Sequence, residues 1–474
     1  MDGFRITLDS AGGMPVFRQI AERVRQGITE GLLGPHDRLP SARSLAAQLG
    51  LARGTVDAAY ALLAGEGYIQ GRGPAGTVIA PGLTIPPMRP REPAAPSLPV
   101  APGMLGGIQG GLPGPLPFRL GLPALDVFPR TLWSRLIARA ARRTMPLGLA
   151  YPDPAGLPAL REAIAAYLRV SRGIACDAGD VLITAGFQGA LALFVHAMPR
   201  PGDPVIVEDP GYFLARESLA RAGMALVPGA VDEAGLDVAR ATAAIPSARF
   251  AVVTPTHQAP MGVSLSLPRR LALLEWAAAT DAWIIEDDYD SEFRYTGHPL
   301  PALKSLDRTG RVLYVGSFSK VLFPGLRLGY LVPPEPLRAP LMAAARTLQA
   351  GLPVLEQQAV AVFMTEGHFA RHLRRMRALY ASRRSALAAA LRTVFGPRLD
   401  LRLQAGGMHL LARLADAPAD TGMVQRALQA GLGPAALSAQ SITGRAGQGL
   451  LLGFTNIPET DALTLTRRLG AAIG

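Results

Sequence analysis

The chain has 474 residues, of which 49% are hydrophobic and 6% aromatic, a composition typical of a globular protein with more than one domain. Its single cysteine, Cys176, excludes an intramolecular disulfide and suits a reducing compartment. No segment has the apolar core of a signal peptide or the length of a membrane helix, so we expect a soluble cytoplasmic protein without a membrane partner.

The formal net charge of +12 favours nucleic-acid binding only if it is concentrated on one part of the chain. Residues 1–80 contain eight arginines and seven acidic residues, so this segment carries almost no net charge. Much of the excess lies in residues 138–143 and 372–384, where solvated helix faces explain it. Evidence for DNA binding must therefore come from the pattern of residues.

Residues 1–80 show the pattern of a small helical domain that ends in a hairpin. Apolar residues recur every four positions from 16 to 28, as on one face of a helix. Ser41 is suited to cap a second helix, and a third helix that includes Val56 follows a short turn at Gly50. The stretch GYIQGRGPAGTVIA then predicts two short strands around a Gly/Pro tip. This order predicts a winged helix-turn-helix, a DNA-binding module.

Residues 81–117 are dominated by Pro, Gly and Ala. Proline removes backbone donors and glycine raises the entropy lost on ordering, so little here can form a core. We interpret this segment as a linker, which as a flexible coil would span roughly 30–37 Å.

From residue 118 onward, strand-like runs alternate with helical ones. The predicted strands are DVLIT (180–184), PVIVE (204–208), FAVVT (250–254), WIIED (283–287), VLYVG (312–316) and LGYLV (328–332). This alternation predicts an α/β domain with a mainly parallel sheet over residues 118–474. The helix-rich region from about 345 is expected to form a smaller C-terminal subdomain.

Only two of the 48 basic residues are lysines, Lys304 and Lys320. A lysine amine, unlike arginine, can lose its proton and attack a carbonyl. Lys304 lies in a loop-like stretch and is interpreted as a chance retention, but Lys320 follows the strand VLYVG, at the end where open α/β sheets bind ligands. Ser317, Ser319 and Arg327 lie nearby and suit a phosphate monoester. An amine beside a phosphate site predicts pyridoxal phosphate bound through Lys320.

This hypothesis requires further groups, and each is found just after a predicted strand. Asp287 is placed to keep the pyridine nitrogen protonated, with Asp288 as its close rival, and Tyr289 to hydrogen-bond the ring oxygen. Tyr212 is placed to stack on the ring. Backbone amides at a helix start, which a phosphate needs, are offered by Gly186, Phe187 and Gln188.

The stretch LPSARSLAAQLGLARGTVDAAYALLAGEGYI, with the hairpin after it, resembles the winged-helix head of the GntR regulator family over residues 15–80. Arg53 lies at the N-terminus of the recognition helix, the end that points at base edges, and an arginine there can make a bidentate contact with guanine. The family usually has a hydroxyl residue before this arginine, whereas this chain has Ala52, which removes a helix cap. The resemblance implies that operator double-stranded DNA is contacted by Arg43, Arg53, Thr55, Arg72 and Gly73.

Residues 118–474 resemble fold-type I aminotransferases, and with the head the whole chain resembles the MocR (GabR-like) regulators. The motifs FSKVLFPGLRLGY, EDDYDSEF, EDPGY and TPTHQAPMG carry this resemblance. It implies that Lys320 binds pyridoxal phosphate as an aldimine and that Arg327 binds its phosphate. It also implies a homodimer with shared cofactor sites, because Tyr151 matches a tyrosine that reaches the phosphate of the partner subunit.

The chain departs from the enzymes of this class at several positions. APMG at residues 259–262 replaces the usual Asn-Pro-x-Gly, which leaves Gln258 or His257 to substitute for the missing amide. Hydroxyl residues of the phosphate loop are also replaced, by Ala185 and Phe187. An arginine for the substrate α-carboxylate is expected before the last strand, but GLLLGFTN has leucines there. Arg445, a few residues earlier, is the candidate effector-binding residue.

We therefore expect a transcriptional regulator that binds operator DNA with its head and pyridoxal phosphate with its body. It is expected to sense a small amino compound by forming an external aldimine that releases Lys320. An active aminotransferase with an autoregulatory head is one alternative, and a sensor of pyridoxal phosphate that controls vitamin B6 supply is another. The departures above leave the turnover of transamination open, and no metal site is predicted.

Overall fold

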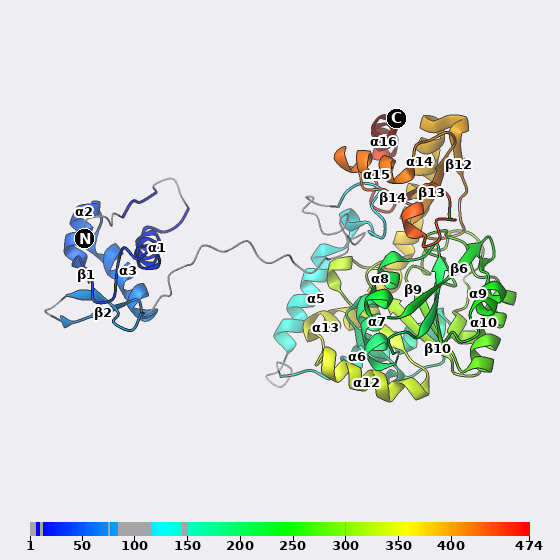
Figure 1. Cartoon of the computed structure of the whole chain (residues 1–474), viewed down its shortest axis with the longest axis horizontal. Helices are drawn as coiled ribbons and strands as arrows, with labels where there is room; N and C mark the ends of the chain where they lie inside the picture. Colours follow the sequence, from blue (N-terminus) through cyan, green and yellow to red (C-terminus); the bar gives the residue numbers. More distant parts are fainter. Residues whose placement is uncertain are drawn as a thin grey trace. The chain divides into compact units, whose positions relative to one another are not determined.

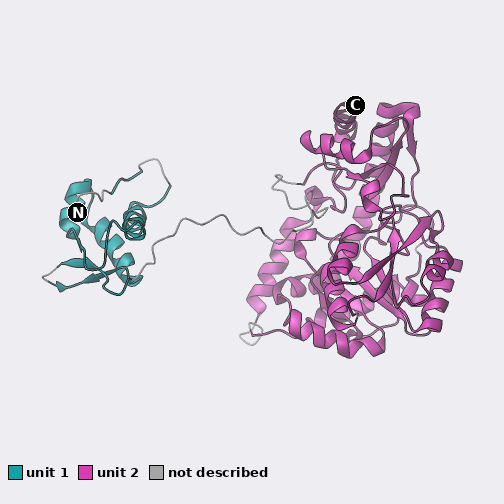
Figure 2. Cartoon of the chain, viewed as in Figure 1, with its two compact units in different colours: residues 1–103 teal, residues 104–474 magenta. Residues whose placement is uncertain are grey.

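The computed structural model describes residues 6–9, 13–73, 76–83, 115–144, 150–198, 200–298 and 300–474. The chain divides into two compact units, residues 1–103 and 104–474, coloured teal and magenta in Figure 2. Most of the predicted linker, residues 84–114, lies outside the described residues. Among the described residues we find no helix that combines the length and the apolar character needed to cross a bilayer.

In its described residues, unit 1 contains three α-helices and a small antiparallel sheet of order β1-β3-β2 (Figure 1). Its elements are α1 (Val16–Thr29), β1 (Arg38–Leu39), α2 (Ala42–Leu49), α3 (Arg53–Gly65), β2 (Ile69–Gly71) and β3 (Thr77–Ile79). Ser41 caps α2 as predicted, since its Oγ accepts a hydrogen bond from Ser44 N at 3.1 Å. Gly50 ends α2 at a φ of 66°. The unit is the predicted winged helix-turn-helix, here called the head.

Unit 2, here called the body, is built on an eight-stranded sheet of order β4-β11-β10-β9-β8-β5-β6-β7. Its strands are β4 (Leu182–Thr184), β5 (Pro204–Asp209), β6 (Ala225–Asp232), β7 (Gly235–Leu236), β8 (Phe250–Val253), β9 (Trp283–Asp288), β10 (Val312–Ser317) and β11 (Gly329–Val332). Neighbours from β10 to β6 pair in parallel, whereas β11 runs antiparallel to β10 and β4. All six predicted strands are confirmed. The sequence missed β6, because Pro228 and Gly229 interrupt its strand pattern.

Helices cover both faces of this sheet. They are α5 (Arg130–Arg143), α6 (Pro158–Ser171), α7 (Gly186–Ala197), α8 (Phe213–Arg221), α9 (Val238–Ala244), α10 (Leu267–Thr280), α11 (Leu303–Leu306), α12 (Glu335–Leu348) and α13 (Val354–Thr365). Strand β8 shows the two faces. Phe250 packs in a core with residues of α7, α8 and α12, whereas Ala251 packs with residues of α9, α10 and α11. Burial on both faces explains why these strands read as continuous apolar runs.

The C-terminal part of the body carries a second sheet, order β12-β13-β15-β14, all antiparallel. Its elements are α14 (His368–Phe395), β12 (Leu399–Leu401), β13 (His409–Leu414), α15 (Asp420–Gln429), β14 (Ala435–Ala436), β15 (Leu450–Gly453) and α16 (Ala462–Ile473). Figure 1 shows these elements in gold to red, above the main sheet. We expected a helix-rich region here, and its short strands were mostly missed.

Residues 115–126, here called the strap, bind this C-terminal part. Gly453 N donates to Phe118 O at 2.8 Å, and Asn456 Nδ2 donates to Leu116 O at 3.0 Å. A Cβ on Gly453 would lie 2.3 Å from Arg119 O, so only glycine lets the strap approach this closely. The strap is thereby fixed along β15.

Candidate functional site

Lys320 lies in the turn that follows β10, at the carboxyl end of a strand next to β9. Its Nζ donates a hydrogen bond to Gly121 O of the strap at 3.0 Å. Gly121 has a φ of 70°, and a Cβ there would lie 2.3 Å from Nζ. Burial lowers the pKa of Lys320, although Asp290 and Asp287 oppose this. The lower pKa favours the neutral amine, which is the nucleophilic form.

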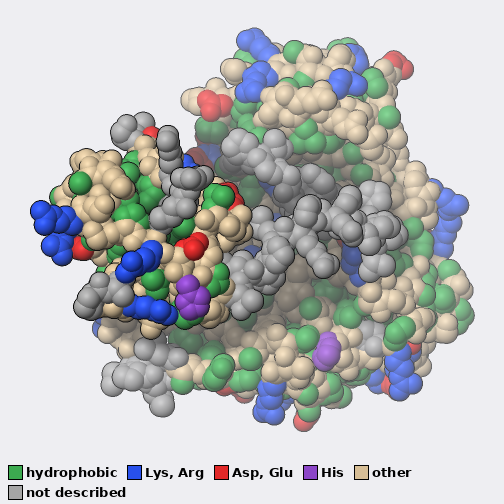
Figure 3. All heavy atoms as spheres, turned by 60° about the vertical axis from the view of Figure 1, so that its left-hand side comes forward, with side chains coloured by type: hydrophobic (Ala, Val, Ile, Leu, Met, Phe, Trp, Pro, Cys, Tyr) green, Lys and Arg blue, Asp and Glu red, His purple; other side chains and the backbone are tan. Residues whose placement is uncertain are grey.

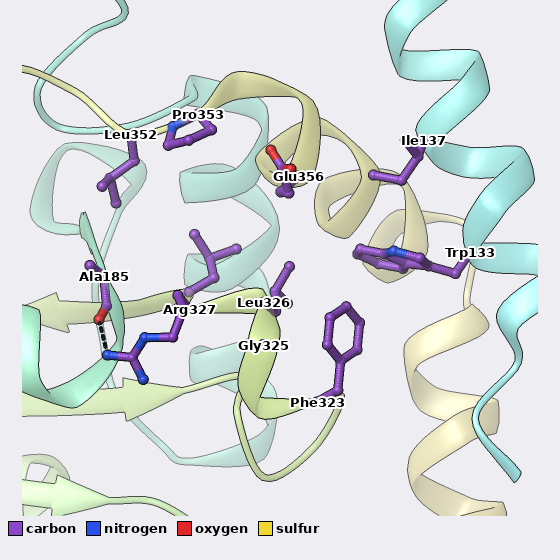
Figure 4. A pocket seen from close by; sticks show the side chains of 11 residues that line it. Trp133, Ile137, Ala185, Phe323, Gly325, Leu326, Arg327, Leu352, Pro353 and Glu356 are labelled. Atoms are coloured by element: carbon purple, nitrogen blue, oxygen red, sulfur yellow. Dashed lines mark hydrogen bonds between the residues drawn. The ribbon is translucent and has the colours of Figure 1, made fainter. Parts of the chain in front are cut away.

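The loop between β4 and α7 faces Arg327. Arg327 Nη2 donates to Ala185 O at 3.1 Å (Figure 4). A Cβ on Gly186, the first residue of α7, would lie 3.7 Å from the same nitrogen. The open N–H groups of the first turn of α7, at Gly186, Phe187 and Gln188, thus lie close to a guanidinium, as an anion site requires.

Arg327 also lines a cavity of about 410 Å³. The other walls come from Trp133 and Ile137 of α5, from residues 323–328, and from the start of α13 (Figure 4). Most of these walls are apolar. The cavity therefore presents an apolar surface beside a cationic one.

Asp287 and Asp288 are adjacent in β9 but have different surroundings. Asp288 Oδ2 lies 2.6 Å from Arg172 Nη2 and accepts a hydrogen bond from Tyr314 OH at 2.6 Å. Asp287 lines a small cavity with Tyr212 and has no hydrogen bond or ion pair among the described residues. Burial raises the pKa of Asp287 well above its usual range, and repulsion from Asp288 adds to this. Asp287 is the carboxyl that remains available.

Tyr212 immediately precedes α8, and its ring lies edge-on to that of Phe187 with 5.9 Å between the ring centroids. Burial raises the pKa of Tyr212 to about 12. Glu208 lines the same small cavity, where burial raises its pKa to about 7. Glu208 was not predicted as a site residue, although it is the penultimate residue of β5 and therefore lies at the edge of the sheet where ligands bind.

Tyr289 follows Asp288 and is bound by a histidine. Tyr289 OH lies 2.9 Å from His257 Nδ1, and Asp290 Oδ2 lies 3.1 Å from the same nitrogen. Burial raises the pKa of Tyr289 well above its usual range, so the hydroxyl keeps its proton. Asp290 was not predicted, although it lies in the same EDDYD motif.

The remaining predicted residues near Lys320 make local contacts. Ser317 Oγ accepts a hydrogen bond from Ser319 N at 3.2 Å. Gln188 Oε1 accepts one from Ser218 Oγ at 2.8 Å, and the buried amide of Gln188 also interacts with the side chain of Tyr212.

Two residues predicted for the cofactor and effector sites, Tyr151 and Arg445, are exposed and lie apart from the groups described above. Tyr151 is 94% exposed. Arg445 lies in an exposed loop whose residues Ile442 and Thr443 donate to the Asp209 carboxylate. No described contact joins Tyr151 or Arg445 to Lys320.

The predicted DNA-contacting residues lie on the recognition helix, the helix before it, and the hairpin. Arg43 in α2, and Arg72 and Gly73 after β2, are exposed, whereas Thr55 in α3 is half-buried. Arg53 begins α3 with its side chain 71% exposed, and its Nε lies 3.3 Å from Asp57 Oδ2. On the face drawn in Figure 3, basic side chains (blue) are scattered among other types, in accord with a charge spread over solvated helices.

The two units together define a class of protein: a winged helix-turn-helix head joined to an aminotransferase-type domain with a lysine in its site. Residues 17–79 match the family described as bacterial regulatory proteins, gntR family. Residues 131–433 match the family described as aminotransferase class I and II.

Relatives and solved structures agree. The chain is 38% identical, over 96% of its length and 93% of the relative, to the probable rhizopine catabolism regulatory protein MocR of Rhizobium meliloti. It is 36% identical, over 92% and 91%, to the pyridoxine biosynthesis transcriptional regulator PdxR of Corynebacterium glutamicum. The α-aminoadipate aminotransferase LysN of Thermus thermophilus, solved with N-(5'-phosphopyridoxyl)-L-leucine, superposes with a TM-score of 0.70 at 30% identity, covering 78% of this chain and 95% of that one. The chain belongs to the MocR-type transcriptional regulators.

The aminotransferase class I and II fold implies pyridoxal phosphate as the cofactor, and the residues of this chain fit it. Asp287 is a buried carboxyl without a partner, which a protonated pyridine nitrogen would offset. Lys320 provides an amine with a lowered pKa. The start of α7 and Arg327 provide donors for a phosphate.

Proposed function

We propose that this regulator holds pyridoxal phosphate at Lys320 and senses a small amino compound there. Bound pyridoxal phosphate supplies an aldehyde that condenses with primary amines. The observation that carries the proposal is the hydrogen bond from Lys320 Nζ to Gly121 O, which ties the amine to the strap. In the sequence, the strap lies near the start of the body, which begins at residue 104. The hydrogen bond therefore joins the Lys320 amine to a segment close in sequence to the head.

Lys320 can transmit a signal because its amine has two alternative uses. When Lys320 Nζ is engaged at the cofactor, it would not be free to donate to Gly121 O. When another amino compound displaces it from the cofactor, Nζ would again donate to Gly121 O. The strap bonds to residues 453–456 of the C-terminal part, where Thr455 Oγ1 donates to Leu122 O. An exchange at Lys320 therefore changes the contacts that hold the strap, which is the differential contact a two-state switch requires.

The residues of β15 favour sensing over efficient transamination of α-amino acids. Leu450, Leu451 and Leu452 are buried where we expected a carboxylate-binding arginine. We propose that Arg445 binds an acidic group of the effector, because Asp209 fixes the loop that carries Arg445 through hydrogen bonds from Ile442 N and Thr443 N. An effector held mainly by its amine would stay bound without rapid turnover.

The assembly we propose is a homodimer in the cytoplasm that binds operator DNA with two heads. The exposed Tyr151 would reach the phosphate held by Arg327 of the partner subunit, beside the apolar cavity of Figure 4. Light scattering on the purified protein should give twice the mass of one chain. A monomer loaded with cofactor would rule out the shared site.

The sensing proposal is tested by absorption spectroscopy with a panel of amino acids, amines and amino sulfonates. The wild type should show a visible band that Lys320→Ala abolishes. Lys304→Ala is the matched control, because Lys304 Nζ donates to Val312 O and lies outside the site. A lasting shift of the band by one amino compound supports a sensor. Bleaching that a keto acid reverses would show an aminotransferase instead, and no band would refute cofactor binding.

A further inference from the structure

The amide of Gln258 cannot serve a bound cofactor. Its Nε2 donates to Glu208 Oε2 at 3.1 Å, to Pro210 O at 2.9 Å and to Ala259 O at 2.8 Å. Its Oε1 accepts from Met261 N at 2.9 Å, and the side chain is 1% exposed. Both of its N–H donors are used within the protein, so none is left for the ring oxygen of a cofactor. Of the two residues that the sequence offered in place of an asparagine, only His257 remains.

His257 reaches the cofactor site through Tyr289. The ring plane directs Nδ1 at Tyr289 OH, 2.9 Å away, whereas Asp290 Oδ2 lies 3.1 Å from Nδ1 outside hydrogen-bonding geometry. Both carboxylate oxygens of Asp290 are buried without a hydrogen-bond partner among the described residues. A carboxylate at this distance favours a proton on Nδ1 over a lone pair. With Nδ1–H donating to the Tyr289 oxygen, the hydroxyl proton of Tyr289 is free for a second acceptor.

Two glycines make room for this imidazole. Gly407 has a φ of 92°, and a Cβ there would lie 2.1 Å from His257 Cε1. Gly262 has a φ of 72°, and a Cβ there would lie 3.1 Å from His257 Nε2. Any other residue at position 407 would displace the ring, so the orientation of His257 is fixed by the fold.

We propose that His257 and Asp290 are positioning residues that keep the Tyr289 hydroxyl as a donor to the phenolic oxygen of bound pyridoxal phosphate. They replace the asparagine amide that enzymes of this class carry. The inference rests on the proposed function, because it requires the cofactor at Lys320. The titratable groups around Tyr289 and His257 are Asp287, Asp288, Asp290, Glu208, Lys320 and His409.

The test is the pH at which the visible band of the loaded full-length protein changes. A hydrogen bond donated to the ring oxygen stabilises its ionised form, so Tyr289→Phe should raise this midpoint by about one pH unit. His257→Phe and the isosteric Asp290→Asn should raise it by about half a unit. His257→Phe added to Tyr289→Phe should cause no further shift, since the histidine acts through the hydroxyl.

His409→Gln is the matched control. His409 lies beside His257, with 5.7 Å between ring centroids, but its Nε2 contacts Pro260 O instead of Tyr289. This variant should keep the wild-type midpoint. A wild-type midpoint in both His257→Phe and Asp290→Asn, or a further shift in the double variant, would overturn the inference. A wild type that takes up no cofactor would overturn the proposed function, and the inference with it.

Discussion

In the head, the arginines predicted to contact DNA are exposed, whereas in the body the groups of the cofactor site are mostly buried. Arg53 has 71% of its side chain exposed, but Asp287 is only 6% exposed. The arginines of the head are expected to bind DNA, whose phosphates supply the opposite charge, so these side chains stay solvated until DNA binds. The body shifts the pKa of its groups by burial. Substitutions at the site of the body should therefore change the free energy of unfolding or the affinity for the cofactor. Substitutions of the exposed arginines of the head should change only the affinity for DNA.

Within the body, Asp288 has a buried charge partner and Asp287 has none among the described residues, so substitutions of the two should have different effects. Asp288→Asn leaves Arg172 without its buried charge partner and should lower the free energy of unfolding of the cofactor-free protein by about 3–5 kcal/mol. Asp287→Asn removes a carboxyl that has no partner, so it should change this free energy little but weaken pyridoxal phosphate binding. Urea denaturation and cofactor titration measure the two effects. Equal destabilisation by both variants would contradict the assignment of Asp287 to the cofactor.

Glu208 provides a pH test of burial in the body. Its pKa is raised from 4.5 to about 7, so the folded state holds more protons than the unfolded state between these values. This stabilisation is fully present below pH 4.5 and is lost as the pH rises through about 7, by at most about 3 kcal/mol. The difference in unfolding free energy between wild type and Glu208→Gln should fall over this range. A pH-independent difference would show that Glu208 is not desolvated.

The head should show the smallest effect on stability. Arg53→Ala removes one exposed ion pair, which contributes almost nothing to folding, but should weaken operator binding by about 1–3 kcal/mol. Arg23→Ala, at an exposed position of α1, is the control for charge alone. Fluorescence anisotropy at fixed salt measures both affinities. Unchanged sequence-specific binding by Arg53→Ala would refute the head assignment.

The sequence predicted the elements and the site where local patterns suffice. Apolar runs and their turn residues gave the six buried strands, and the Ser41 cap gave the start of α2. The structure was needed where the role of a residue depends on the direction of its side chain. Adjacent aspartates in β9 are equivalent in sequence, and only the position of Arg172 separates their roles.

Two other features depend on contacts that the sequence did not predict. Lys304 was interpreted as a chance retention in a loop, but it lies in α11 and its Nζ donates to Val312 O at 2.7 Å. The contact between Lys320 and Gly121 joins residues 199 positions apart. No local pattern predicts the Lys320–Gly121 pair, because it arises from the packing of the strap against the turn that follows β10.

The central claim is that the chemistry of the body at Lys320 controls the head. We would measure the anisotropy of labelled DNA from upstream of the chain's own gene, with pyridoxal phosphate alone and with an amino compound that shifts the absorption band. DNA affinity should change on adding that compound to the wild type and stay constant in Lys320→Ala. An equal response of Lys320→Ala, or a wild type whose affinity ignores a compound that shifts its band, would contradict the account.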